Sequence, residues 1–367
     1  MSFFADLFRA KEKVESAVLI EVSTKSVAGA YARYAEGAMP AVLYTRRFPV
    51  EVRENELQEK AMLRALTMLI DTLIREGAPI LMRSAGRGSA DVVLVSIDAP
   101  WQKTSVRTEY FEQKTPFIFS RSLVMTAIEQ TGVKAPGKLL VDESIIGTIL
   151  NGYETRDPYG KKTSRAAVVV LTSLIDEHIA RHITSTLESA FHTRNVLPIA
   201  GSSLRCQALQ RAFPHERNAL ILDATGPQTS MALLRKGLLV SINEVFGTDA
   251  SHEWVEAIKT ELAELSKRYP LPRTIFLLAR EPDTAALERT LEEGHLEKLW
   301  LSENPPKIAP VAAGHITGLV RQLAAAPPDL ELLLMALFRQ HRFSEEAVAL
   351  VQEPSVLALH GTILPKR

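Results

Sequence analysis

The sequence predicts an α/β protein of two related halves, the first of which carries a small inserted α+β subdomain. The main observation is a repeat. The stretch "VLIEVSTKSVAGAY" at 18–31 returns as "LILDATGPQTSMALL" at 220–234, and each is an apolar run, one acid, polar residues and a second apolar run. Each stretch also opens the same order of three strands, a helix and a further strand. A period this long indicates a duplicated domain rather than a solenoid.

The first copy begins with three strands separated by polar or Gly/Pro turns, predicted at 17–22, 28–34 and 41–48. A helix is expected at about 56–76, because leucine and isoleucine recur there at helical spacing, and Gly77 is expected to end it. The apolar run "DVVLVSI" at 91–97 then predicts a buried strand.

The second copy repeats this order. Its three strands are "ALILDA", "SMALLRK" and "LLVSINE", linked through Gly226 and Gly237. A helix at about 251–268, a strand at 274–279 and a helix at about 283–293 follow.

The segment between the copies has strand-like pieces around one helix at about 120–131, with an N-cap signal at Ser120 and a stop at Gly132. A helix at about 175–191 then returns the chain to the first half. At the other end, "AAAPPD" at 324–329 has the composition of a linker, and "LELLLMALFRQ" and "SEEAVALVQ" predict two helices. We expect this pair to pack on the second half or on a neighbouring subunit.

The predicted organisation has five parts. They are a leader helix at 1–16, a first half at 17–99 and 173–216, the inserted subdomain at 100–172, a reduced second half at 217–323, and a linker and helical tail at 324–367.

The composition is that of an ordinary globular protein. Of 367 residues, 46% are hydrophobic and 23% are charged, which argues against disorder. The 43 basic and 43 acidic residues balance, so nothing in the overall charge directs the chain to nucleic acid. The single cysteine, Cys206, excludes an internal disulfide framework and a cysteine zinc site, which fits a reducing cytosol.

Several stretches resemble the actin-like ATPases of the FtsA and PilM type, which have a duplicated ribonuclease H-like fold. The sequence "NGYETRDPYGKKTSRAAVVVLTS" is similar to the turn and last strand of that family's inserted subdomain. "FIFSRSLVMTAIEQ" resembles the segment leading into the helix of the insertion, and "ALILDATGPQTSMALLRKGLLVSINEVFG" resembles the second phosphate hairpin. The resemblance covers about 1–330. It implies a site for Mg-ATP between the halves, bracketed by two hairpins that each begin with an acid.

This chain departs from the family pattern at the places that would hold the nucleotide. The first hairpin keeps an acid but lacks the glycine that brings backbone N–H groups to a phosphate, and the second contains Pro227, which has no N–H. The third place is Arg280-Glu281-Pro282-Asp283, without glycine. Two interpretations stay open, turn-capping acids at strand ends or a residual ATP and magnesium site, and hydrolysis is not expected. The vestigial site would comprise Glu21, Ser23, Thr24, Lys25, Asp223, Thr225, Gly226 and Thr229.

Two other features of the sequence suggest binding sites. His178 and His182 are four residues apart on a predicted helix, the spacing of helical metal ligands, but no third ligand is close in sequence, so a solvated helix face is favoured and no metal is expected. The leader carries an apolar stripe with basic residues behind it, and it either docks on a partner or membrane or folds back on its own domain. The stripe consists of Phe3, Phe4, Leu7 and Phe8.

These observations predict a cytoplasmic actin-like scaffold without catalytic residues or a required cofactor. It would bind partner proteins of a membrane-associated assembly, in type IV pilus assembly or cell division, and contact the membrane indirectly or through its leader. Self-association stays open. The alternative is an ATP-binding, nucleotide-switched protein of the FtsA type that polymerises.

Overall fold

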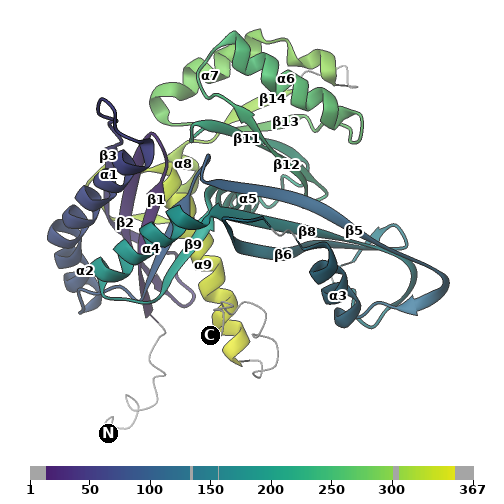
Figure 1. Ribbon diagram of the computed structural model, residues 1–367, viewed down its shortest axis with the longest axis horizontal. Helices are drawn as coiled ribbons and strands as arrows, with labels where there is room; N and C mark the ends of the chain where they lie inside the picture. The colour runs from purple at the N-terminus through teal and green to yellow at the C-terminus, as the bar shows by residue number, and fades with distance from the viewer. Residues whose placement is uncertain (1–13, 133–134, 156, 301–305, 352–367) are drawn as a thin grey trace, which may run out of the picture.

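The chain builds three β-sheets in the computed structural model, which describes residues 14–132, 135–155, 157–300 and 306–351 (Figure 1). Two sheets have the same strand order, β3-β2-β1-β4-β9 in the first and β12-β11-β10-β13-β14 in the second. In each, the central strand pairs antiparallel with the next strand and parallel with the fourth. The predicted duplication is thereby confirmed.

The strands of the first sheet are β1 Val14–Val22, β2 Ser26–Ala35, β3 Ala41–Pro49, β4 Val92–Ile97 and β9 Val196–Ala200. A short late strand, β15 Arg321–Gln322, pairs with β3, so the chain has returned to the first sheet by residue 321. The strands of the second sheet are β10 Ala219–Asp223, β11 Gln228–Arg235, β12 Leu238–Phe246, β13 Thr274–Leu278 and β14 Lys307–Pro310.

Both sheets are buried on both faces, and alternate side chains enter different cores. On the central strands, Ile20 and Leu222 face outward into cores that each half forms with its own outer helices. Leu19 and Ile221, one residue earlier, share a single core between the halves. The two halves are therefore held together by a common apolar interior.

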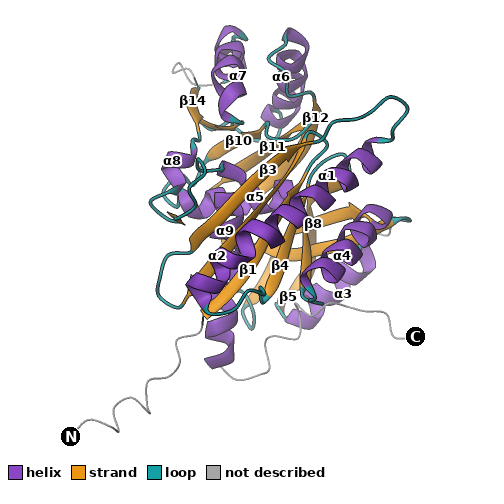
Figure 2. Cartoon of the chain, turned by 90° about the vertical axis from the view of Figure 1, so that its left-hand side faces the viewer, coloured by secondary structure: helices purple, strands orange, loops and turns teal. Residues whose placement is uncertain are grey.

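Helices cover the outer faces and fill the space between the sheets. Figure 2 shows α1 and α2 in front of the first sheet, and α6 and α7 cover the second sheet at the top of Figure 1. Helices α5, α8 and α9 contribute to the shared core. Their bounds are α1 Gln58–Thr72, α2 Ala78–Ala85, α4 Glu177–Phe191, α5 Gly201–Ala212, α6 His252–Ser266, α7 Glu281–Glu293, η2 Leu296–Leu299, α8 Ala313–Ile316 and α9 Leu330–Val351.

The prediction that Gly77 ends the first helix is wrong. The helix continues through a π-helical turn, η1 Leu73–Gly77, into α2 and ends at Gly86, whose φ of 73° is left-handed. A Cβ on Gly77 would lie 2.6 Å from Cδ2 of Tyr31. This glycine therefore permits close contact between helix and sheet rather than termination.

The strands between the halves form a sheet of their own, in the order β5-β8-β6-β7. Helix α3 Arg121–Thr131 packs on it, and the Ser120 hydroxyl accepts a hydrogen bond from the Leu123 N–H at 3.3 Å, as its N-cap position predicts. Figure 1 shows this sheet extending away from the two halves, with β5 beside β12. The strands are β5 Gln102–Ile118, β6 Lys138–Leu150, β7 Tyr153–Glu154 and β8 Lys162–Asp176.

The expectation of two separate C-terminal helices is wrong, because one helix spans both predicted segments. Packing on a neighbouring subunit stays a prediction. Helix α9 is continuous and packs on α5 and on the first sheet. Its buried Leu332 and Phe338 enter the shared core, where Ala28 and Ala30 of β2 leave room for a closely packed helix. The small residues of the first sheet therefore determine where this segment packs.

Candidate functional site between the two halves

The first predicted hairpin bonds mainly to itself and to its surroundings. The Ser23 hydroxyl donates to the Ser26 carbonyl oxygen at 3.0 Å and accepts from the N–H groups of Lys25 and Ser26 at 3.3 and 3.2 Å. The Thr24 carbonyl oxygen accepts from Nε2 of Gln58 at 2.6 Å. These groups therefore already satisfy one another within the turn and the start of α1.

Lys25 reaches across to the second half. Its Nζ donates to the Thr248 hydroxyl at 2.6 Å, and burial lowers the pKa of its ammonium. The second hairpin is also internally bonded. Oδ1 of Asp223 accepts from both the N–H and the hydroxyl of Thr225, at 3.2 and 2.6 Å.

The remaining two residues of the second hairpin also face protein groups. The Thr229 hydroxyl donates to the Gly247 carbonyl oxygen at 2.9 Å and accepts from Nε1 of Trp254 at 2.8 Å. Gly226 lies beside Asp98, because a Cβ on it would be 3.7 Å from Oδ2 of that aspartate.

Asp98 is a third carboxylate of the site and was not among the predicted site residues. It follows β4 directly, as Glu21 and Asp223 stand at the ends of β1 and β10. Its N–H donates to the Val22 carbonyl oxygen at 3.0 Å, which holds it next to the end of β1. The acid after "DVVLVSI" was therefore a readable signal, since carboxyl ends of neighbouring parallel strands meet at one edge.

Arg205 of α5 joins two of these acids. Its Nη1 lies 2.9 Å from Oδ1 of Asp98, and its Nε donates to Oδ2 of Asp223 at 2.5 Å. All three side chains are almost fully buried. Gly201 makes room for the pair, because a Cβ there would lie 1.8 Å from Oδ1 of Asp98. No local pattern in the sequence indicated this arginine.

Arg47 of β3 holds the third strand-end acid, Glu21, with Nη1 2.7 Å from Oε2. The same guanidinium binds both carboxylate oxygens of Asp329, at 2.8 and 2.9 Å, and pairs with Glu331. Arg280 is also paired with Glu331, through a contact of 3.1 Å. Asp329, directly before α9, and Glu331, in its first turn, therefore bring two acids to the edge where the strand ends of the halves meet.

Five carboxylates and three guanidiniums make up this cluster, so acid is in excess. Burial raises the pKa of Glu331 to about 7, although Arg47 and Arg280 act in the opposite direction. Burial likewise raises the pKa of Glu21 and that of Asp98. These three carboxyl groups therefore bind protons at a higher pH in the folded state than in the unfolded chain.

The pKa of Asp329 moves in the opposite direction. Burial acts to raise it, but the charge and hydrogen bonds of Arg47 outweigh burial and hold the pKa below its usual value. Of the two acids at the start of α9, Asp329 is therefore the one that stays ionised more readily.

A few buried polar atoms of the cluster have no hydrogen-bond partner among the described residues. They are Oε1 of Glu21, Oδ2 of Asp98 and Nη2 of Arg280. Oε1 of Glu21 lies 3.8 Å from Nη2 of Arg280, an ion pair without a hydrogen bond. These atoms are the polar groups of the cluster that its internal pairs leave without a hydrogen bond.

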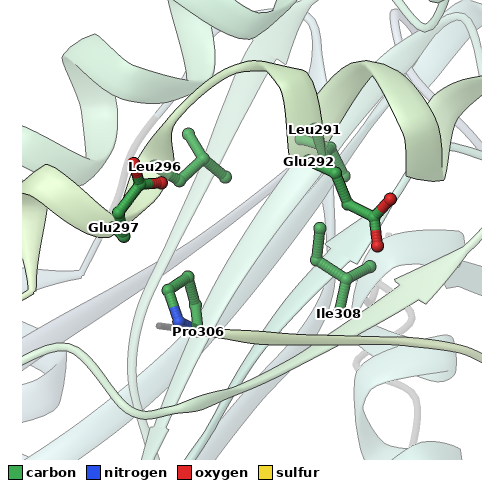
Figure 3. Close-up of a pocket in the computed structure, with 6 residues that line it drawn as sticks. All are labelled: Leu291, Glu292, Leu296, Glu297, Pro306 and Ile308. Carbon is green, nitrogen blue, oxygen red and sulfur yellow. The ribbon is translucent and has the colours of Figure 1, made fainter. Parts of the chain in front are cut away.

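Two cavities among the described residues lie away from the cluster of acids and arginines. One, of about 240 Å³, lies in the second half between α7, η2 and β14 (Figure 3). Another, of about 360 Å³, lies over the outer face of the first half, between β3 and α1. Neither is lined by the acids of the cluster.

The predicted docking stripe of Phe3, Phe4, Leu7 and Phe8 lies outside the described residues. Across the part of the chain that is described, no helix is both long enough and apolar enough to span a membrane.

Comparison with known proteins defines the fold. No family model and no curated protein matches the sequence. The chain is similar to a solved structure entitled "PilM-PilN type IV pilus biogenesis complex", with a TM-score of 0.50 and 14% identity over 90% of this chain and 98% of that one. Together with the repeated sheet order, this likeness defines a two-domain actin-like fold.

Weaker matches have TM-scores too low to support a conclusion. One is a Bacteroides thetaiotaomicron protein with an actin-like ATPase fold and unknown function, with a TM-score of 0.44 and 10% identity over 88% of this chain and 95% of that one. Another is a Ppx/GppA family member from Aquifex aeolicus, with a TM-score of 0.37 and 13% identity over 90% of this chain and 89% of that one.

Proposed function

We propose that this chain is a non-catalytic actin-like scaffold that binds partner proteins of a membrane-associated assembly. The observation that carries the proposal is the pairing of Arg47 with Glu21, Asp329 and Glu331. In this arrangement Asp329 and Glu331, at the start of α9, supply two of the anions that Arg47 binds. Arg280 of the second half binds the same Glu331, and Arg205 of α5 binds Asp223 of the second half, so ion pairs within the chain connect the halves at the place where a ligand would lie.

The residues at the site do not fit a magnesium nucleotide. Magnesium requires carboxylate oxygens and ordered waters, but Glu21 and Asp223 each already bind an arginine. A triphosphate would have to displace Glu331 from Arg47, and Pro227 offers no N–H to a phosphate oxygen. The chemistry of the cluster therefore favours a structural role.

The comparison supports a role in protein assembly. A similar fold occurs in the solved structure of a PilM-PilN type IV pilus biogenesis complex. The sequence resemblance to FtsA and PilM points in the same direction. Pilus assembly is therefore the first setting to test and cell division the second, at the inner face of the cell membrane, with the stripe of Phe3, Phe4, Leu7 and Phe8 as the proposed docking element.

One observation favours the alternative, an ATP-binding and nucleotide-switched protein. Glu21 and Asp98 each keep a buried carboxylate oxygen without a hydrogen-bond partner. Such atoms are available to a water or cation that accompanies a nucleotide.

Thermal denaturation with and without Mg-ATP separates these functions. A ligand at a hundred times its Kd would add about 2.7 kcal/mol to the free energy of unfolding. We expect no rise in melting temperature at millimolar Mg-ATP. A clear rise in melting temperature that Asp223→Asn abolishes would refute the proposed non-catalytic scaffold without a nucleotide site. It would favour the nucleotide-switched protein.

A further inference from the structure

Three potential metal ligands meet on the outer face of the first half, two of them four residues apart on α4 and the third, Glu59, far from them in the sequence. Oε1 of Glu59 lies 3.1 Å from Nε2 of His178 and 3.3 Å from Nδ1 of His182. The ligand atoms of all three lie within 4.8 Å of one another. The third ligand that the two histidines lack in the sequence is therefore supplied by another helix.

We propose that Glu59, His178 and His182 form a binding site for a divalent transition-metal ion, of which Zn²⁺ suits the donor set best. Two imidazoles and one carboxylate are a common set of protein ligands for zinc. Zinc bonds of 2.0–2.1 Å in a tetrahedral arrangement place neighbouring ligand atoms about 3.3 Å apart. The two measured separations from Glu59 are close to this value.

Rigid elements present these side chains. Glu59 is in the first turn of α1, and both histidines are on the first two turns of α4, which contacts α1. Asp176 caps α4, because its Oδ1 accepts from the N–H groups of His178 and Ile179 at 3.1 and 3.2 Å. Buried apolar side chains of both helices pack into the same core. The ligands are therefore preorganised by packing that does not depend on the ion.

The site is open to solvent on one side. The side chains of His178 and His182 are 64% and 50% exposed, whereas that of Glu59 is 28% exposed. A water molecule would then complete the coordination of the ion. Because α4 directly follows β8 of the inserted sheet, bound metal would fasten this junction to α1.

Isothermal titration calorimetry with Zn²⁺ tests the proposal. The untagged chain is first treated with a chelator to remove bound metal. We expect saturable binding of one ion, weakened about tenfold or more in each of Glu59→Gln, His178→Ala and His182→Ala. The matched control is His252→Ala. His252 is an exposed helical histidine with an acid, Glu256, four residues on, at 4.0 Å, and this change should leave the affinity unaltered.

Titration with Co²⁺ adds a spectroscopic measurement. A tetrahedral or five-coordinate Co²⁺ site with imidazole ligands should give visible absorption bands, and these should disappear in His178→Ala. Absence of saturable Zn²⁺ binding at millimolar concentration would overturn the proposal. So would affinity retained in any one of the three ligand variants, including retention in Glu59→Gln alone, which would mean chelation by two imidazoles only. Neither measurement depends on the scaffold function, so the two proposals can fail separately.

Discussion

Removing Arg47 should destabilise the cluster of five carboxylates and three guanidiniums more than any other single change. Its guanidinium pairs with Glu21, Asp329 and Glu331, and two of these acids are almost fully buried. Arg47→Ala would leave their charges without their main partner. Breaking a buried ion pair from one side costs about 3–5 kcal/mol, and the partial exposure of Arg47 places the expected loss near the lower end, at about 3 kcal/mol.

The loss should depend on pH with a defined sign. Arg47 is the strongest influence lowering the pKa of Glu21 and of Glu331, so its removal raises both folded-state values further above the unfolded value. A group with a raised folded pKa stabilises the fold fully below its unfolded pKa, and this contribution is lost as pH rises through the folded pKa. Arg47→Ala should therefore be less destabilising at pH 5.5 than at pH 7.5.

Denaturation in guanidinium chloride at these two pH values, followed by circular dichroism, measures the effect. Arg46→Ala is the matched control, because Arg46 is exposed on the same strand and contacts the Phe48 ring, 5.2 Å from its centroid. It should cost less than about 1 kcal/mol. Equal losses for the two variants at pH 7.5, or a larger loss for Arg47→Ala at pH 5.5, would refute the reasoning.

Further predictions concern the cluster and the leader. The wild type should lose stability as pH rises from about 4.5 to 7, because the pKa of Glu331 is about 7 in the folded state. Glu331→Gln removes this titration and should reduce the slope of the unfolding free energy against pH by about 1 kcal/mol per pH unit. An unchanged slope would contradict this. Gly201→Ala should destabilise by about 1–3 kcal/mol, since its Cβ would overlap Asp98, whereas Gly314→Ala has open space and should lower the melting temperature little; equal melting temperatures would argue against the steric role. The double change Phe4→Ala and Phe8→Ala should weaken association with partner or membrane, at about 1.5–3 kcal/mol per phenylalanine, and leave the melting temperature nearly unchanged; a large fall in melting temperature would place the stripe in the core of the protein.

Much of the fold could be predicted from the sequence, because local periodicity encodes it. Alternating and continuous apolar runs identified β1, β2 and β3 and their counterparts β10, β11 and β12, and the repeat of their order revealed the duplication. The acids at the strand ends were readable for the same reason, since Glu21 and Asp223 follow apolar runs. Helix α5 was not predicted, because its buried face includes Ser203 and Arg205 as well as apolar residues.

The partners of those acids were decided only by the tertiary structure. Arg47 and Glu331 are 284 residues apart, and no local pattern indicates that β3 and the start of α9 meet. The same holds for Glu59 and its two histidines, which look like a solvated helix face until α1 lies beside α4. Hydrophobic periodicity specifies which face of an element is buried, but it does not specify what is buried against it. Which charges face each other depends on how the sheets and helices pack, and that geometry is set by the whole chain.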